Sequence, residues 1–388
     1  MSTPIEVEDL LERLLRTDSR NPALAADSPG EGAIARQVAT VLEAMGLEVT
    51  LQPVDGERAN VIAVLPGIES AATVILEAHL DTVPADAATM AVRREGRRLY
   101  GRGACDTKGS LAAMIGAVDL LRRMPGPRPT VLLVGAVDEE YIMRGARQLA
   151  RTLPSADAVV IGEPTSLLPA RAHNGFVRVS VGVRGTAAHS SRAEMGVNAI
   201  VQAGRLVTDI DAGLGHRLRA ASASIAGPAL LSATMISGGI APNVIPDRCT
   251  IWFDRRVPPG IDPLAALEEL RAEVDAICAR TGIDAAVDEP LVALGGLDTP
   301  PQSLAVRAAC QAASTVLARD IESVGVTYST DACCFYDRPD LPCVVLGPGS
   351  IEQAHGEVEW IDLDEVIAAR DLYVQLALDI HALKETAA

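Results

Sequence analysis

The stretch VILEAHLDTV, Val74–Val83, decides how the rest of the chain is interpreted. Its apolar first half is typical of a buried strand. His79 and Asp81 stand two residues apart where that strand ends, so the alternation of side chains along a strand sends both the same way. A histidine that binds a metal usually gives its second ring N–H to an oxygen acceptor such as a carboxylate. The pair therefore fits a metal ligand, His79, oriented by Asp81, although such pairs also arise for purely structural reasons.

The composition is that of a globular protein with a strong negative charge. Hydrophobic residues make up 48% of the 388 residues and charged ones 22%, which argues against long disordered regions. The 34 Lys and Arg against 51 Asp and Glu give a net charge of −17. This charge disfavours nucleic acid and anionic membrane surfaces as partners. It suits metal cations or cationic substrates, and it also serves solubility.

The sequence shows no sign of export or membrane insertion. The N-terminal segment MSTPIEVEDLLE is acidic and has neither the basic nor the apolar region of a secretory signal. The long uncharged run at 220–246 is broken by several Gly and Pro residues and is not a membrane span. Seven scattered cysteines, without a CxxC spacing, favour reduced thiols. We therefore expect a cytoplasmic protein.

Strands alternate with helices towards both ends of the chain. Apolar periodicity predicts helices at 5–16, 32–45, 108–124, 144–151, 303–318 and 363–382, and strands at 47–52, 60–65, 73–79, 130–136, 158–161 and 341–347. Such alternation argues for a three-layer α/β/α sheet. Functional groups of these sheets gather in loops beyond the strand ends.

The pattern changes from about Phe176, where VRVSVGVRG alternates with period two. Helices are predicted at 196–209 and 263–280, and strands at 231–236 and 248–257. These elements describe a small, ferredoxin-like α+β unit with a half-exposed sheet. We therefore predict an α/β domain of residues 1–174 and 289–388 and an inserted domain of residues 175–288.

Acidic or histidine-bearing loops stand where such a sheet places function. The loops are GRGACDTKGS with Asp106, AVDEEYIMRG with Glu139 and Glu140, VIGEPTS with Glu163, and GPGSIEQAHGE with His355. Two His, two Glu and one central Asp can build a two-metal site, in which the Asp bridges and each ion takes one His and one Glu. Because adjacent carboxylates seldom both reach one ion, one of the paired Glu residues can bind metal while the other takes a proton from water.

A series of motifs, in chain order, resembles a known enzyme family. The segments are AHLDTV, GRGACDTKG, DEE, GEPTS, GTAAHSS, GVNAI, PNVIPD, DRRVPPG and GPGSIEQAH. They resemble the co-catalytic di-zinc hydrolases that include acetylornithine deacetylase, aminoacylase, succinyl-diaminopimelate desuccinylase and carboxypeptidase G. The resemblance covers about 5–380, and GEPTSLLPARAHNG with GPGSIEQAH looks most like the acetylornithine deacetylase branch.

The resemblance implies two Zn²⁺ ions per chain, or Co²⁺ in their place. His79 and Glu163 would bind one ion, and Glu140 and His355 would bind the other. Asp106 would bridge the two. The family also implies a zinc-peptidase-like catalytic domain, with the inserted domain acting as a lid and as a dimerisation surface.

The same resemblance implies roles for further residues. Glu139 would be the general base that activates the bridging water, and Asp81 would orient His79. His189, within GTAAHSS, matches an oxyanion-stabilising His that reaches the active site of the partner subunit, so a homodimer is implied. Asn243 and Arg256 match positions that bind the carbonyl or carboxylate of the substrate, and the Arg fork suits a carboxylate.

Some of these residues also have structural interpretations. Asp106 could cap the helix that begins near Lys108, since Asp is a favoured N-cap residue. Glu163 could belong to a solvated turn, and Arg256 could be a surface strand residue. Together, however, these interpretations do not explain why the acidic or histidine-bearing loops recur at the positions where an α/β sheet places functional loops. Cys105 has no Cys–His signature of a nucleophile, and GRGACD is not the GxGxxG of a dinucleotide-binding oxidoreductase.

The implied reaction is hydrolysis of an amide on a small molecule. Metal-bound hydroxide would remove an acyl group, in the first place acetyl, from an N-acyl-L-amino acid such as N-acetylornithine. The alternatives are a carboxypeptidase, dipeptidase or desuccinylase on the same scaffold, and a non-catalytic binding protein. Three departures from the family pattern leave the substrate open: Asn174 in place of a Lys, the bulky Tyr141, and HGEVEW in place of HxPDE.

Overall fold

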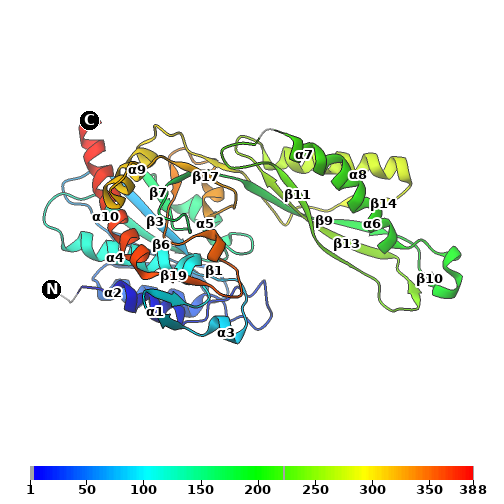
Figure 1. Cartoon of the computed structure of the whole chain (residues 1–388), viewed down its shortest axis with the longest axis horizontal. Coiled ribbons are helices and arrows are strands. Elements are labelled where there is room, and N and C mark those ends of the chain that lie inside the picture. Colours follow the sequence, from blue (N-terminus) through cyan, green and yellow to red (C-terminus); the bar gives the residue numbers. More distant parts are fainter. Residues whose placement is uncertain (1–3, 222, 388) are drawn as a thin grey trace. The chain divides into compact units, whose positions relative to one another are not determined.

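The computed structural model describes residues 4–221 and 223–387 (Figure 1). The chain divides into two compact units. Unit 1 comprises Met1–Arg171, Thr299–Val324 and Thr330–Ala388, and unit 2 comprises Ala172–Asp298 with Gly325–Ser329. Both ends of the chain thus build unit 1. The predicted domains are residues 1–174 with 289–388 and residues 175–288. That each of them folds independently stays a prediction.

The largest sheet is mixed and has strand order β1-β2-β6-β3-β7-β18-β8-β16, with β17 paired to β8, and its strands from β1 to β18 in this order belong to unit 1. Its strands are β1 (Glu48–Asp55), β2 (Arg58–Leu65), β3 (Thr73–His79), β6 (Thr130–Ala136), β7 (Ala158–Ile161), β8 (Ala170–His173), β16 (Leu297–Asp298), β17 (Val324–Val326) and β18 (Cys343–Val345). The central strands β6, β3, β7 and β18 run parallel. Their carboxyl ends therefore lie at one edge, where the predicted loops begin.

Helices cover both faces of this sheet (Figure 1). They are α1 (Val7–Leu15), α2 (Gly32–Ala44), α4 (Gly109–Arg123), α5 (Arg144–Thr152), α9 (Leu304–Leu317), α10 (Leu363–Ala387) and the short η4 (Asp331–Phe335). Val74 and Leu76 of β3 share one buried core with α1, α2, α4, α9 and α10. The alternate side chain Glu77 faces the other way, beside Asp331 of η4, which packs against α5. The predicted α/β/α layering is confirmed.

A small sheet of three short strands was not predicted. It has the order β19-β5-β4 and consists of β4 (Arg93–Glu95), β5 (Arg98–Tyr100) and β19 (Trp360–Asp362). The short helix α3 (Ala87–Met90) precedes it. β5 leads directly into the loop of Asp106, and β19 follows the loop of His355. The small sheet therefore connects two of the predicted site loops.

Unit 2 has the ferredoxin-like order of elements. They are β9 (Gly175–Arg184), α6 (Ala199–Ile210), β11 (Leu230–Gly238), β13 (Arg248–Val257), α8 (Pro263–Thr281), β14 (Asp284–Val287) and the additional strand β15 (Val292–Leu294). The strand order is β11-β13-β9-β14, with antiparallel neighbours. The β-α-β-β-α-β succession confirms the predicted fold of the inserted segment. Val177 and Val179 of β9 are buried under α6 and α8, as the period-two pattern requires.

Short elements complete the described chain. They are η1 (Ala104–Lys108), β10 (Ala188–His189), η2 (Ser190–Met195), η3 (Asp211–Gly215), α7 (His216–Ala220), β12 (Val244–Ile245) and η5 (Ile351–Gln353). β10 and β12 form a separate two-stranded sheet. Within residues 4–221 and 223–387, no helix is both long and apolar enough to cross a membrane.

Candidate metal centre

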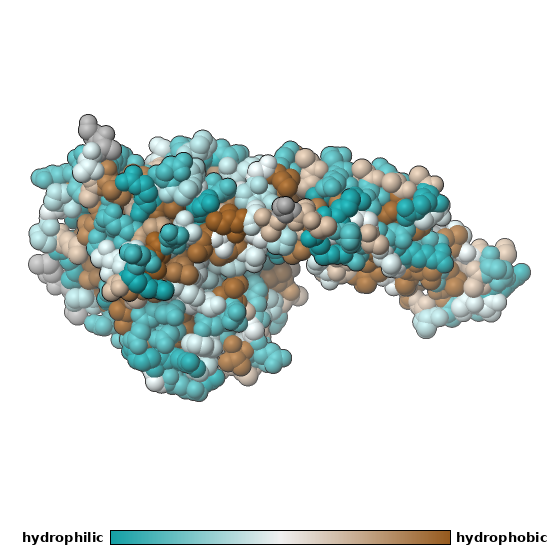
Figure 2. Space-filling model, turned by 45° about the horizontal axis from the view of Figure 1, so that its top comes forward, coloured by the Kyte–Doolittle hydropathy of each residue, from teal (hydrophilic) through white to brown (hydrophobic). Residues whose placement is uncertain are grey.

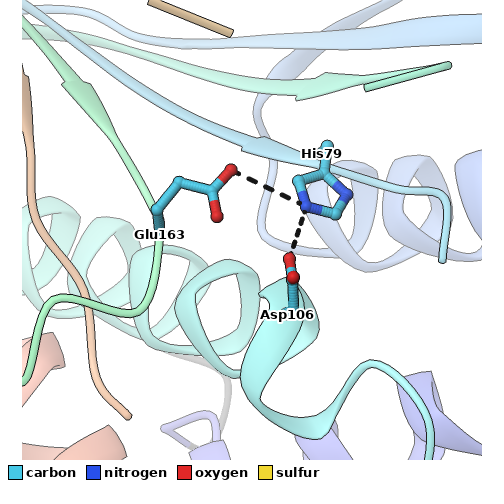
Figure 3. A group of neighbouring side chains, drawn as sticks. All are labelled: His79, Asp106 and Glu163. Atoms are coloured by element: carbon cyan, nitrogen blue, oxygen red, sulfur yellow. Dashed lines mark hydrogen bonds and ion pairs between the residues drawn. The ribbon is translucent and has the colours of Figure 1, made fainter. Parts of the chain in front are cut away.

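His79 is the last residue of the central strand β3, and its side chain is buried. Its Nδ1 lies 3.0 Å from the backbone carbonyl oxygen of Asp81, so this nitrogen donates its proton there. In the neutral form of the ring, Nε2 would then carry the lone pair that can bind a metal. It lies 2.9 Å from Asp106 Oδ1 and 3.7 Å from Glu163 Oε1 (Figure 3). The three side chains thus point at one another from β3, η1 and the loop after β7.

A second group of the same kind shares Asp106. The other carboxylate oxygen of this residue, Oδ2, lies 3.2 Å from His355 Nε2. His355 Nε2 lies 3.1 Å from Glu140 Oε2. In each group the ligand atoms lie within 4.8 Å of one another, which is close enough for one metal ion to bind all of them. Asp106 therefore offers one oxygen to each group.

The loop after β6 is held by Asp81. The backbone N–H of Glu139 donates to Asp81 Oδ1 at 3.0 Å, and that of Glu140 donates to Oδ2 at 3.1 Å. Asn21 Nδ2 also donates to Oδ2, at 2.7 Å. Asp81 itself is fully buried. This one carboxylate thus fixes the backbone that carries both paired Glu residues, in addition to lying next to the ring of His79.

The structure argues against the structural interpretations of two candidate ligands. Helix α4 begins at Gly109, and no side chain caps its N-terminus, so Asp106 is not a helix cap. Glu163 is 5% exposed and therefore does not belong to a solvated turn. Cys105 is buried, and burial raises the pKa of its thiol, which excludes an activated nucleophile. The peptide bond between Asp106 and Thr107 is cis.

Burial and neighbouring charges shift the pKa values of these side chains. Burial first, and then the charge of Asp106, raises the pKa of Glu163 well above its ordinary range and also raises that of Glu140. Hydrogen bonds to Asp106 and Glu140 raise the pKa of His355 to about 11. Although burial opposes it, hydrogen bonds from His355 and His79 hold the pKa of Asp106 below its usual range. A divalent cation would stabilise the ionised form of these buried carboxyl groups, so the donor set fits a metal.

The remaining predicted residues belong to unit 2. His189 lies on β10 and Asn243 lies just before β12, and both are exposed. The backbone N–H of Ser190 donates to the carbonyl of Asn243 at 3.0 Å, which joins their segments. Arg256 of β13 is half-buried, forms an ion pair with Asp254 at 2.8 Å and is not simply a surface residue.

Two of the family departures also have defined places. Asn174, which stands where a Lys is usual, is buried, and its Nδ2 donates to the carbonyl of Ala226 at 2.9 Å. The amide thus joins the connection between β8 and β9 to the loop before β11. Tyr141 is half-buried directly after the paired Glu residues.

Sequence reasoning missed the residues that support the ligands. Asn21 holds Asp81 across 60 positions of sequence. Glu31 and Arg58 form a buried ion pair at 2.6 Å, and both contact Asp138, the residue before the paired Glu residues. No sequence motif predicts these partners, because only the fold brings them close to the site loops. Glu359 is a further case, and the only sequence signal for it was its place four residues after His355.

Comparison with known proteins identifies the class to which this fold and site belong. Residues 75–379 match the family model of Peptidase family M20/M25/M40. The chain belongs to this family and is a metallohydrolase with His, Asp and Glu groups arranged to bind metal.

Individual relatives extend the comparison. The acetylornithine deacetylase of Erwinia tasmaniensis is 33% identical to this chain over 342 residues, which cover 86% of each protein. The dipeptidase Dug1p from Saccharomyces cerevisiae has a TM-score of 0.80 at 14% identity, covering 97% of this chain and 96% of that one. The YXEP protein of Bacillus subtilis, a dinuclear metal binding peptidase, has a TM-score of 0.70 at 19% identity, covering 97% and 98%. At such identities, the two solved structures show a shared fold.

Proposed function

We propose that this protein is a di-metal amidohydrolase that removes an acyl group, in the first place acetyl, from an N-acyl-L-amino acid such as N-acetylornithine. The observation that carries the proposal is the position of Asp106, with one carboxylate oxygen in each of two donor groups. The similarity to an acetylornithine deacetylase over most of the chain supports the choice of substrate.

The donor groups support a set of ligands for two ions, Zn²⁺ or Co²⁺. His79, Asp106 and Glu163 would hold the first ion, and Asp106, Glu140 and His355 would hold the second. When bound, such a pair supplies Lewis-acid chemistry, because it polarises a carbonyl and lowers the pKa of water. Asp81 would orient His79 through its backbone carbonyl, which accepts the Nδ1 proton, and through its carboxylate, whose Oδ1 lies 3.6 Å from that nitrogen.

Glu139 is the proposed general base. The backbone N–H of Glu139 donates to Asp81, and Glu139 directly precedes the proposed ligand Glu140 in the sequence. Burial, followed by the charges of Asp331 and Glu140, raises the pKa of Glu139 well above the ordinary range. In its ionised form, this carboxylate would accept the proton of the attacking water and return it to the leaving amine.

The proposed roles of the unit 2 residues rest on their chemistry and on the family resemblance. The backbone N–H of Ser191 donates to His189 Nδ1, so the neutral ring carries its proton on Nε2. This is the tautomer that can donate to a developing oxyanion. Asn243 and Arg256 would bind the carbonyl or carboxylate of the substrate, and the guanidinium of Arg256 also donates to Ser329 Oγ at 3.2 Å.

A homodimer is part of the proposal, because the resemblance implies that His189 serves the partner subunit. Exposed apolar side chains of unit 2 support it: Met195 and Met235 are each 65% exposed, and Ile240 is 88% exposed. Figure 2 shows such hydrophobic surface among hydrophilic residues. β11, which carries Met235, stands at the end of its sheet and can pair with a strand of a second copy. Light scattering after gel filtration tests this association.

The seven free cysteines support a reducing, cytoplasmic location, since secreted proteins usually pair their thiols. Labelling of thiols in freshly lysed cells, before any oxidation in air, tests this part of the proposal.

The experiment that tests the function compares substrates. Metal-loaded protein is assayed with N-acetylornithine, other N-acyl amino acids and a set of dipeptides, and kcat/KM is measured for each. The proposal predicts that an N-acyl amino acid has the highest kcat/KM. A dipeptide with the highest value would instead support a dipeptidase, which is the activity of the structurally similar Dug1p. Bound metal without any turnover would contradict an enzymatic role.

A further inference from the structure

The carboxylate of Glu359 accepts four hydrogen bonds in the interior of unit 1. Its Oε1 accepts from the backbone N–H groups of Cys105, at 2.9 Å, and Asp106, at 3.0 Å. Its Oε2 accepts from the backbone N–H of Gly103, at 3.1 Å, and from Arg102 Nη1, at 2.6 Å. The side chain is 0% exposed. All four donors belong to the loop that carries the shared ligand.

This loop needs an acceptor from outside itself. Asp106 has φ −120° and ψ 90°, so its backbone departs from helical geometry although it lies within η1. A regular helix therefore cannot satisfy the N–H groups on this turn, and buried donors without acceptors are strongly destabilising. Glu359 provides the acceptor, and it does so from a position 253 residues further along the chain.

The small sheet places Glu359 at that point. Trp360 of β19 pairs with Tyr100 of β5, and the backbone N–H of Gly101 donates to the carbonyl of Glu359 at 3.1 Å. The backbone hydrogen bonds between β19 and β5 thus continue into the loop that carries Asp106. The register of β19 against β5 therefore determines where the carboxylate of Glu359 lies.

Arg102 extends the network to the second ligand loop. Its Nη2 donates to the carbonyl of Gly356 at 3.0 Å, and Gly356 follows His355. Its side chain is 5% exposed and is ion-paired to Glu359. The same pair of side chains therefore contacts the backbone next to His355 and the backbone of Asp106.

We propose that Glu359 and Arg102 are a positioning pair that sets the separation of Asp106 and His355, and thereby the geometry of the second metal site. The proposal rests on the function proposed above, because it requires that these two ligands share an ion. Both residues act through the backbone of the ligand loops, which accepts from Arg102 and donates to Glu359. Partners of ligating residues commonly affect metal affinity by about 10–100-fold.

Glu359→Gln tests the pair, with Asp119→Asn as the matched control. Asp119 is also buried, and it accepts from the backbone N–H of Ile5 and from two arginines on α4, outside the metal site. Each purified, metal-stripped variant is titrated with Co²⁺ to measure affinity, and the Tm of the metal-free form is recorded. We expect Glu359→Gln to bind Co²⁺ about 10–100-fold more weakly than the parent protein, and Asp119→Asn to bind it equally well.

A second variant, Arg102→Lys, keeps the positive charge but lacks the fork that joins Glu359 to Gly356. We expect it to weaken Co²⁺ binding as well, even if Glu359→Gln does not fold. The proposal is overturned if the folded variants bind Co²⁺ with the affinity of the parent protein and only lower Tm, as Asp119→Asn does. Failure of the parent protein to bind Co²⁺ would instead refute the proposed function, so the two failures are distinguishable.

Discussion

The two regions that carry predicted site residues differ in how their side chains are held. In unit 1, His79 and Asp106 are buried and contact each other, and Asp81 has three donors of its own. In unit 2, His189 and Asn243 are exposed, and the ring of His189 contacts only its near neighbour Ser191 among the hydrogen bonds described. The fold of unit 1 thus holds His79 and Asp106, two of the proposed metal ligands, whereas His189 and Asn243 of unit 2 are accessible from solvent.

This difference separates two parts of the proposed catalysis. Metal binding should depend on unit 1 alone, because the fold of that unit already brings the donor groups together. Binding of the substrate and stabilisation of the oxyanion should depend on unit 2. Variants in the two units should therefore fail in different measurements, and each of the following changes tests that separation.

Glu139→Gln should have the largest effect on turnover. The amide cannot accept the proton of water, so we expect kcat to fall by about 10²–10⁴-fold or more. Because Glu139 is not in either donor group, metal content measured by atomic emission should remain at the parent level. Loss of metal together with activity would mean that the roles of Glu139 and Glu140 are reversed.

His189→Ala should lower kcat by about 10²–10³-fold, the size expected for loss of one oxyanion donor, with unchanged Co²⁺ affinity. A dimer in which His189 serves the partner makes a sharper prediction. Co-expression of His189→Ala with Glu139→Gln should give mixed dimers with one intact site, and these should be active. Inactive mixed dimers would refute the action of His189 across subunits.

Asp81→Asn should mainly weaken metal binding, by about 10–100-fold. The variant loses one acceptor for the N–H groups of Glu139 and Glu140 and alters the partner of the His79 ring. Isothermal titration of the metal-stripped variant with Zn²⁺ measures the change. A fall in kcat with unchanged Zn²⁺ affinity would show that the carboxylate of Asp81 acts on the base and that the backbone carbonyl is enough to orient His79.

The pH dependence of metal binding should be the smallest of these effects. In the metal-free protein, the pKa of His355 is raised to about 11 by Asp106 and Glu140, so the ring is protonated at neutral pH. A metal must displace that proton, since only the neutral ring binds it. Affinity should therefore rise with pH, by about tenfold per unit for each proton released. Titration in buffers of different ionisation enthalpy counts the protons, and affinity independent of pH would exclude His355 as a ligand.

Much of the site was predictable because its residues stand in loops that follow apolar strands. A continuous apolar run predicts strand β3, and His79 is the last residue of this strand. The residue types in these loops indicated a two-metal site, and the family resemblance then grouped His79, Asp106 and Glu163. Apolar periodicity also identified the main helices, since burial against a sheet requires it.

The rest was not predictable, for two physical reasons. β4 has the sequence RRE, and all its side chains are exposed, so it shows no alternation that would mark a strand. The supports of the site, Asn21 and Glu359, act across 60 and 253 positions of sequence, and a polar residue has no local feature that names so distant a partner. Both required the fold to be known.

The central claim is that Asp106 joins two metal ions in unit 1, and one titration tests it most directly. Metal-stripped protein is given Zn²⁺ in steps, and bound metal and hydrolysis of N-acetylornithine are measured at each step, in parallel with Asp106→Asn. We predict that the parent protein binds two ions per chain and reaches full activity with the second, and that the variant loses both metal and activity. Two ions bound equally well by Asp106→Asn, or full activity without metal, would contradict the claim.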